Sequence, residues 1–280
     1  MPARIARTVA AALCAATLLA LVAAPATAKT PRARASVIGG RPANLQDWGF
    51  TAAVLTPNTL CSGVVLSSTK VLTAAHCLGR LSTMIIRTDS TSAFAGGQAS
   101  GVADAAISPG RAHSFRDDLA VLTLTSPTSA PPLQVADGAE DAAYSRAGAR
   151  LQIAGFGNRN PIRGRHQVGL LTAAKVTVRS CRLPSWAICD YGGRAGEVVL
   201  RLKKHRRLKR QVKKSVCSGD SGGPLVARTP NGPRLIGVAE ASSSPSRLNP
   251  FFEVICGLKG FPSLHSRTAS HLSFIQANVP

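Results

Sequence analysis

The chain has 280 residues and a formal net charge of +21, from 34 Lys or Arg against 13 Asp or Glu. It contains neither a repeat of fixed period nor a low-complexity domain, which excludes solenoid and array architectures. Residues 37–280 alone provide 244 residues, enough for one large core or for two small barrels.

The first 28 residues have the pattern of a secretory signal peptide. Two arginines precede an apolar run from Val9 to Ala24, and residues 26–28, Ala-Thr-Ala, form a small-residue cleavage signal. The run is too short and wrongly flanked for a retained transmembrane helix, and no later run is long enough to span a bilayer. We therefore expect a secreted, extracellular protein that loses Cys14 and keeps six cysteines in an oxidising setting.

Short apolar stretches, separated by Gly, Pro, Ser and Asn clusters, predict an all-β fold. They have strand length and either alternate with polar residues or run continuously apolar. The expected strands are Phe50–Leu55, Gly63–Leu66, Val71–Ala74, Met84–Arg87, Val102–Ile107, Leu119–Leu124, Leu151–Ala154, Ala174–Val178, Pro224–Ala227 and Leu235–Ala239. Residues 268–279 differ, because Leu272, Ile275 and Val279 recur at helical spacing, and there we expect a C-terminal helix.

The stretch CSGDSGGP at 217–224 contains the chemistry around which the chain is organised. A serine hydroxyl is a poor nucleophile until a base takes its proton, and the resulting oxyanion needs fixed N–H donors. Gly219 and Gly222 permit a tight turn, so the amides of Gly219 and Ser221 are candidates to point at one carbonyl oxygen.

A base and its orienting carboxylate are predicted elsewhere. Of six histidines, only His76 follows a β-rich stretch that ends in small residues and a cysteine, VLTAAHC at 71–77. The other five are interpreted as surface or satisfied core residues. In RDDLAVLTL at 116–124, Asp118 directly precedes an apolar strand and is the expected carboxylate, whereas Asp117 is expected to be solvated.

Four motifs in order, VIGG at 37–40, TAAHC at 73–77, DLAVL at 118–122 and GDSGGP at 219–224, resemble the chymotrypsin family of serine endopeptidases. The resemblance implies two antiparallel six-stranded Greek-key β-barrels, at about 37–135 and 145–265, with the active site between them. It also implies that Ser221 attacks the scissile carbonyl, that His76 acts as base and then acid, that Asp118 orients His76, and that the Gly219 and Ser221 amides hold the oxyanion.

Residues 29–36 are then expected to be a propeptide. In the family, cleavage before such a VIGG frees an ammonium, here of Val37, that pairs with the acid before the nucleophile, here Asp220. A cut after Arg34 leaves Ala35 and Ser36 ahead of Val37. We therefore expect a different activating protease or later trimming.

Six cysteines allow 15 pairings. The resemblance implies the disulfides Cys61–Cys77, Cys181–Cys189 and Cys217–Cys256. No CxxC pair occurs and the cysteines are dispersed, so neither a zinc site nor another cofactor is expected.

The resemblance places Ser215 at the base of the primary specificity pocket, where trypsin-like members have an aspartate. A neutral base favours cleavage after small to medium apolar residues. Ser242 and Ser263 replace glycines of the family and would narrow the pocket. Glu240 stands where the family usually has a serine that bonds the catalytic aspartate. Either two carboxylates meet there, or the local alignment slips, or Glu240 or Asp190 reaches the pocket and favours basic residues.

A basic tract, RLKKHRRLKRQVKK at 201–214, is inserted where the family generally has a shorter loop. It holds nine Lys or Arg and no acid, and residues 37–280 as a whole carry +16. One interpretation is a mobile solvated loop, another a processing loop, and a third an anchor for polyanions such as nucleic acid, anionic glycans or an acidic cell surface. No aromatic residue interleaves the tract, so base stacking is not expected.

The sequence therefore predicts a secreted, monomeric serine endopeptidase that acts on proteins or peptides. The alternative is a cationic polyanion-binding or antimicrobial pseudoprotease that works through residues 201–214. A purely structural β protein has no reason to hold four catalytic motifs in order.

Overall fold

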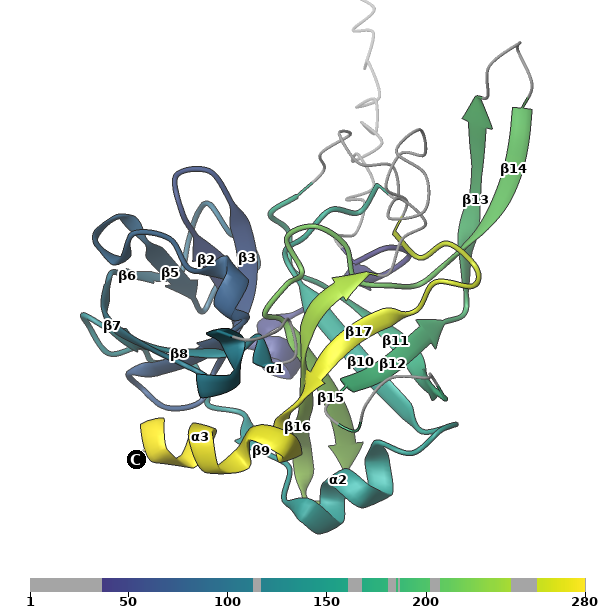
Figure 1. Cartoon of the computed structure of the whole chain (residues 1–280). Coiled ribbons are helices and arrows are strands. Elements are labelled where there is room, and N and C mark those ends of the chain that lie inside the picture. The colour runs from purple at the N-terminus through teal and green to yellow at the C-terminus, as the bar shows by residue number, and fades with distance from the viewer. Residues whose placement is uncertain are drawn as a thin grey trace, which may run out of the picture. The chain divides into compact units, whose positions relative to one another are not determined.

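β-Strands dominate the described chain and form three sheets, of eight, seven and two strands (Figure 1). The computed structural model describes residues 37–112, 117–160, 168–180, 185, 187–201, 207–242 and 256–279. The predicted signal peptide and propeptide lie outside these residues.

The strands and helices are short, as the turn-rich sequence predicts. The strands are β1 (Arg41–Pro42), β2 (Thr51–Leu55), β3 (Leu60–Val65), β4 (Lys70–Thr73), β5 (Ile85–Thr88), β6 (Gln98–Ser100), β7 (Val102–Ile107), β8 (Ala120–Leu124), β9 (Gln134–Val135), β10 (Arg150–Gly155), β11 (Thr172–Arg179), β12 (Ala187–Gly192), β13 (Arg194–Arg201), β14 (Arg207–Lys213), β15 (Pro224–Thr229), β16 (Gly232–Ser242) and β17 (Ser263–Arg267). The α-helices are α1 (Leu45–Trp48), α2 (Gly138–Tyr144) and α3 (Leu272–Asn278).

The N-terminal half folds into a seven-stranded sheet in the order β6-β5-β2-β3-β4-β8-β7, with antiparallel neighbours. This sheet curls without pairing its two end strands. In the C-terminal half, the strands pair in the order β11-β10-β15-β16-β17-β12. Because β12 also pairs with β11, these strands close a six-stranded barrel. The two-barrel expectation is thus confirmed, with one barrel closed and the other open.

A hydrophobic core joins the two sheets. Trp48, Phe50 and Leu72 of the first half pack in one buried cluster with Phe156 and Leu235 of the second. Burial of large apolar side chains is the main favourable term in folding, so this shared cluster fixes how the two halves meet.

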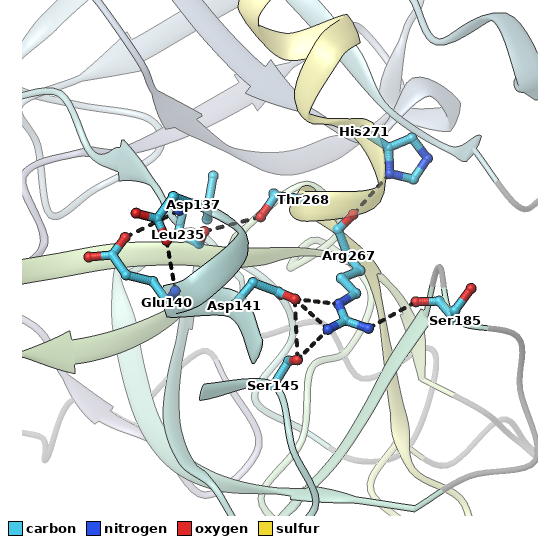
Figure 2. Close-up of polar contacts among 9 residues, drawn as sticks. All are labelled: Asp137, Glu140, Asp141, Ser145, Ser185, Leu235, Arg267, Thr268 and His271. Carbon is cyan, nitrogen blue, oxygen red and sulfur yellow. Dashed lines mark hydrogen bonds and ion pairs between the residues drawn. The ribbon is translucent and has the colours of Figure 1, made fainter. Parts of the chain in front are cut away.

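In the C-terminal segment, a 3₁₀ turn is followed by α3, and Ile275 of α3 packs into the same buried cluster. Figure 2 shows how the segment is held to the closed barrel. Thr268 Oγ1 donates to the Leu235 carbonyl at 3.1 Å, and the Arg267 guanidinium donates to the buried Asp141 carboxylate of α2, through Nε at 2.8 Å. The helix predicted over 268–279 is therefore confirmed for Leu272–Asn278, and the residues before it form the 3₁₀ turn.

All ten predicted strands overlap observed ones. The sequence did not reveal β12 and β17, because both bury polar residues, among them Asp190 and His265, which hide the hydrophobic pattern. It also did not reveal α2, whose N-terminus has a capping box between Asp137 and Glu140.

The basic tract is not a loop throughout. Residues 207–213 form β14, which pairs with β13 from Arg194↔Lys213 to Arg201↔Arg207 in a separate two-stranded ribbon (Figure 1). The ribbon leaves the closed barrel where Gly192 N donates to the Lys214 carbonyl and Lys214 N to the Gly193 carbonyl, both at 3.0 Å.

Candidate active site

His76 and Asp118 lie next to the ends of two adjacent strands of the first sheet. His76 lies in the 3₁₀ turn Ala75–Cys77 that follows β4, and Asp118 precedes β8, whose Ala120 pairs with Thr73 of β4. The Asp118 carboxylate accepts the His76 backbone N–H at 2.8 Å through Oδ1 and contacts the ring Nδ1 through Oδ2. Asp118 is buried, whereas 36% of the His76 side chain is exposed, so the turn presents an oriented imidazole at the surface.

Ser221 lies in a tight turn made by two glycines with positive φ, Gly219 at 96° and Gly222 at 82°. Among the described residues, neither the Gly219 amide nor the Ser221 amide donates a hydrogen bond. Two such donors, two residues apart beside a serine, fit an oxyanion-binding arrangement. Ser221 Oγ is 3.3 Å from the Glu240 carbonyl oxygen and makes no hydrogen bond to His76.

Ser62 holds this turn against the first sheet, a role that the sequence analysis did not assign. Its backbone N–H donates to the Ser221 carbonyl at 2.8 Å, and its Oγ donates to the Gly219 carbonyl at 2.9 Å. The same Oγ accepts the Phe156 N–H at 3.0 Å. Its position directly after Cys61 was the available signal, because the predicted disulfide brings that segment beside His76.

Two predicted disulfides are present, Cys61–Cys77 and Cys217–Cys256. Cys189 is also disulfide-bonded, but its expected partner Cys181 lies outside the described residues. Cys61, Cys77 and His76 lie close enough to suggest metal ligands. Since both sulfurs are tied up in the disulfide, only the histidine nitrogen remains as a donor, and we assign no metal to this cluster.

Asp220 is fully buried behind Ser221. Its carboxylate accepts the Gly157 N–H at 2.8 Å and the Cys217 N–H at 2.9 Å. Burial nonetheless raises the pKa of Asp220 to about 7, because these two bonds only partly offset the loss of hydration. Val37 is also buried, but its N–H donates to Thr172 Oγ1 at 2.6 Å, so the structure does not bring it to Asp220.

The predicted pocket base is built from two hydroxyls. Ser215 and Ser263 are both fully buried, and their Oγ atoms lie 2.9 Å apart. Ser242 pairs with Ser263 through the β16–β17 backbone register. Ser263 is thus the common neighbour of Ser215 and Ser242, and on its other side it pairs with Asp190 of β12.

Asp190 and Glu240, the two acids considered for the pocket, have other partners. Asp190 Oδ2 lies 2.6 Å from His265 Nε2, and both side chains are fully buried. Glu240 is the extra residue at a register shift in β16, because Ala239 and Ala241 on either side of it pair with the consecutive residues His265 and Leu264. Its carboxyl is near Asp118 and accepts only a long hydrogen bond, 3.5 Å, from Ser266 Oγ.

Glu240 therefore forms the carboxylate pair considered from the sequence. Burial, and then the negative charge of Asp118, raise the pKa of Glu240 to about 7, while His76 and His265 act in the opposite direction. A carboxylic acid replaces the expected serine next to Asp118 and holds its proton up to near neutral pH.

Asp117, which was expected to be solvated, is partly exposed but has a side-chain partner. Its Oδ1 lies 2.6 Å from Nε2 of His271, a buried residue just ahead of α3. This contact links the C-terminal segment to the residue that precedes Asp118.

The sequence of the chain matches a known family. A family model described as Trypsin matches residues 37–255. The chain belongs to the trypsin family. It is 28% identical over 260 residues to "Trypsin" of Saccharopolyspora erythraea, covering 87% of this chain and 98% of that protein. It is 25% identical over 290 residues to "Trypsin CFT-1" of Choristoneura fumiferana, covering 93% and 98%.

Another relative, "Serine protease 56" of Homo sapiens, is 28% identical over 278 residues, covering 91% of this chain and 40% of that protein. Trypsin-family membership makes the chain a chymotrypsin-like serine endopeptidase. Within its described part, the structure contains no helix that is both long and apolar enough to cross a membrane.

The raised pKa of Glu240 predicts a pH-dependent cost. The folded chain holds this proton more tightly than the unfolded chain, so the free energy of unfolding falls as pH rises from about 4.5 to about 7. We expect Glu240→Gln to be more stable than its parent by about 1 to 3 kcal/mol at pH 8 and nearly equal to it at pH 4. Urea unfolding in a Ser221→Ala background, which avoids self-digestion, measures the difference, and equal profiles at all pH values would contradict it.

Proposed function

We propose that this trypsin-family chain is a secreted endopeptidase whose catalytic residues are Ser221, His76 and Asp118. The observation that carries the proposal is the contact of the His76 ring with the buried Asp118 carboxylate, in a fold that ties the Ser221 turn to the same sheet through Ser62. Secretion is supported by the predicted signal peptide at 1–28.

In this mechanism Ser221 Oγ attacks the scissile carbonyl carbon while its proton passes to His76 Nε2. The carbonyl oxygen becomes an oxyanion between the unbonded Gly219 and Ser221 amides. Collapse of the tetrahedral intermediate expels the amine, which takes the proton from His76 and leaves an acyl-enzyme. Water then repeats the sequence and releases the acid. Asp118 keeps Nδ1 protonated, so that Nε2 is free to act as the base.

Before the attack, Ser221 Oγ must turn from the Glu240 carbonyl toward His76. Catalytic hydrogen bonds often tighten only when the substrate is bound.

We expect Ser221→Ala to lower kcat by about 10⁵ to 10⁶ and Asp118→Asn by about 10⁴, because the first removes the nucleophile and the second favours the wrong tautomer of His76. Peptide hydrolysis by the secreted, processed protein measures both. Ser218→Ala is the matched control, since Ser218 is an exposed serine of the same loop. A Ser221→Ala protein with normal kcat would refute the assignment.

We further propose that the enzyme cleaves after small to medium apolar residues. The paired Ser215 and Ser263 hydroxyls at the pocket base support this, together with the engagement of Asp190 by His265 and the position of Glu240 beside Asp118. A buried base without a carboxylate leaves a Lys or Arg side chain without a partner, which is costly.

A peptide library that varies only the residue before the scissile bond tests this preference. We expect Ala, Val or Leu to be favoured over Arg or Lys by at least about 100-fold in kcat/KM, the range that an unpaired buried charge imposes. Preference for Arg or Lys would overturn the pocket assignment and leave the catalytic residues unaffected.

Activation is proposed to follow cleavage between Ser36 and Val37. The buried Asp220 supports this, because burial raises its pKa to about 7 and the described residues provide it with amide donors but no ion pair. Val37 is already docked in the closed barrel, where Ile38 N donates to the Ser215 carbonyl at 3.0 Å. Movement of a new Val37 ammonium from Thr172 to Asp220 would supply the charge and connect the pocket base to the nucleophile turn.

We expect N-terminal sequencing of the active protein to begin at Val37. In a Ser221→Ala background, the uncut chain should lose stability as pH rises from about 4 to about 7, and the chain starting at Val37 should lose about 2 to 4 kcal/mol less, because an ammonium lowers the pKa of Asp220. Unfolding at pH 5 and pH 8 measures both forms. Parallel pH profiles would show that Val37 does not pair with Asp220.

A further inference from the structure

A basic groove crosses the outer face of the closed barrel where β1, β11, β10 and β15 lie side by side. Two adjoining depressions, of about 560 and 420 Å³, share the lining residues Gln152, Lys175, Lys214 and Arg228. Arg41 lines the larger depression and Arg150 the smaller one. Of these residues only Lys214 belongs to the tract at 201–214, and the cations together come from five separate parts of the chain.

Strand alternation produces the groove. Along β11 the buried positions Ala174, Val176 and Val178 face the barrel core, so Lys175 between them faces outward. Lys175 pairs with Gln152 of β10 in the sheet register, and Arg41 of β1 pairs with Ala173. The basic side chains therefore share one face of one sheet.

Arg228 is held in place at one end of the groove. Its guanidinium stacks over the Trp48 ring, with 4.8 Å from Cζ to the ring centroid. Its Nε donates to Gln152 Oε1 at 3.1 Å and one Nη donates to the Asp47 carbonyl at 2.9 Å. Partial burial lowers the pKa of Arg228, and the Asp47 carboxylate partly opposes this, so the guanidinium stays a cation.

The positive charge of the groove is hardly compensated. Within the part of the chain that the structure describes, Arg41, Arg150, Lys175 and Lys214 form no ion pair. Asp47 is the one acid that lines either depression. Five cations, of which only Arg228 has partners within the groove, face this one carboxylate and make a surface suited to an external polyanion.

The groove continues onto the ribbon. Lys214 lines both depressions and directly follows Lys213, the last residue of β14. Lys209 and Arg210, farther along β14, are exposed. The ribbon and the groove thus form one basic path that begins at Arg41 and leaves the barrel at Lys214.

We propose that this groove binds a linear anionic polysaccharide that bears sulfate or carboxylate groups. Trp48 is the single aromatic residue lining the groove, and it is buried beneath Arg228, so nucleobases find no stacking surface there. A chain of anionic sugars needs only the cations. Such binding would hold the protease on an anionic matrix without use of the residues proposed for catalysis.

The test measures binding of heparin, a sulfated polysaccharide, to full-length Ser221→Ala protein over a range of NaCl concentrations. Lys175→Gln with Lys214→Gln removes two groove cations. The matched control, Arg80→Gln with Arg146→Gln, removes two exposed cations outside the groove. We expect the groove variant to bind heparin about tenfold more weakly near 0.1 M NaCl. The slope of log K against log [NaCl] should become shallower by about one to two, and the control should change little.

In the wild-type background, the groove variant should hydrolyse short peptides at the parental rate.

Equal losses of heparin binding in groove and control variants would show that only net charge matters and would overturn the proposal. Loss only in Lys209→Gln with Arg210→Gln would move the site to the ribbon and overturn the groove. Duplex DNA that binds as tightly as heparin, with the same dependence on Lys175 and Lys214, would overturn the polysaccharide assignment.

Discussion

The arrangement of this candidate active site depends on the hydrogen bonds that Ser62 makes across the two halves of the fold. His76 and Asp118 belong to the open sheet, whereas Ser221 belongs to the closed barrel, so their chemistry requires a fixed junction. Ser62 belongs to the first half and its three partners to the second. It donates to the carbonyls of Gly219 and Ser221 and accepts the Phe156 N–H. Because Ser62 is fully buried, water does not compete for these bonds, and the nucleophile turn is held in register with the histidine turn.

Two carboxyl groups beside this junction lack what a buried charge needs. Burial raises the pKa of each to about 7: the amide bonds of Asp220 only partly offset it, and the charge of Asp118 adds to it at Glu240. Their situations differ in reversibility. An ammonium released by cleavage can relieve Asp220, whereas Glu240 has a fixed neighbour in Asp118. Under the proposed activation, the first cost would be removed by cleavage, whereas the second would persist in the cleaved chain.

Local sequence patterns predicted much of the fold because the ten expected strands bury alternate or continuous apolar residues. The motifs around His76, Asp118 and Ser221 also identified the residues that the fold gathers. The pairs Asp190–His265 and Asp117–His271 were beyond reach, since each joins residues more than 70 positions apart through burial rather than pattern. The strand β14 was hidden for a related reason, as a run of cations lacks the apolar alternation by which a strand is recognised.

The base of the β13–β14 ribbon has a consequence for how this chain can vary. Gly192, Gly193 and Lys214 close the base with two reciprocal backbone hydrogen bonds, so the points of exit and return lie side by side. A segment attached in this way can lengthen, shorten or be replaced by a tight turn while the barrel strands keep their register. The ribbon is in this sense a module, whose length and charge can change without reshaping the catalytic half-sites.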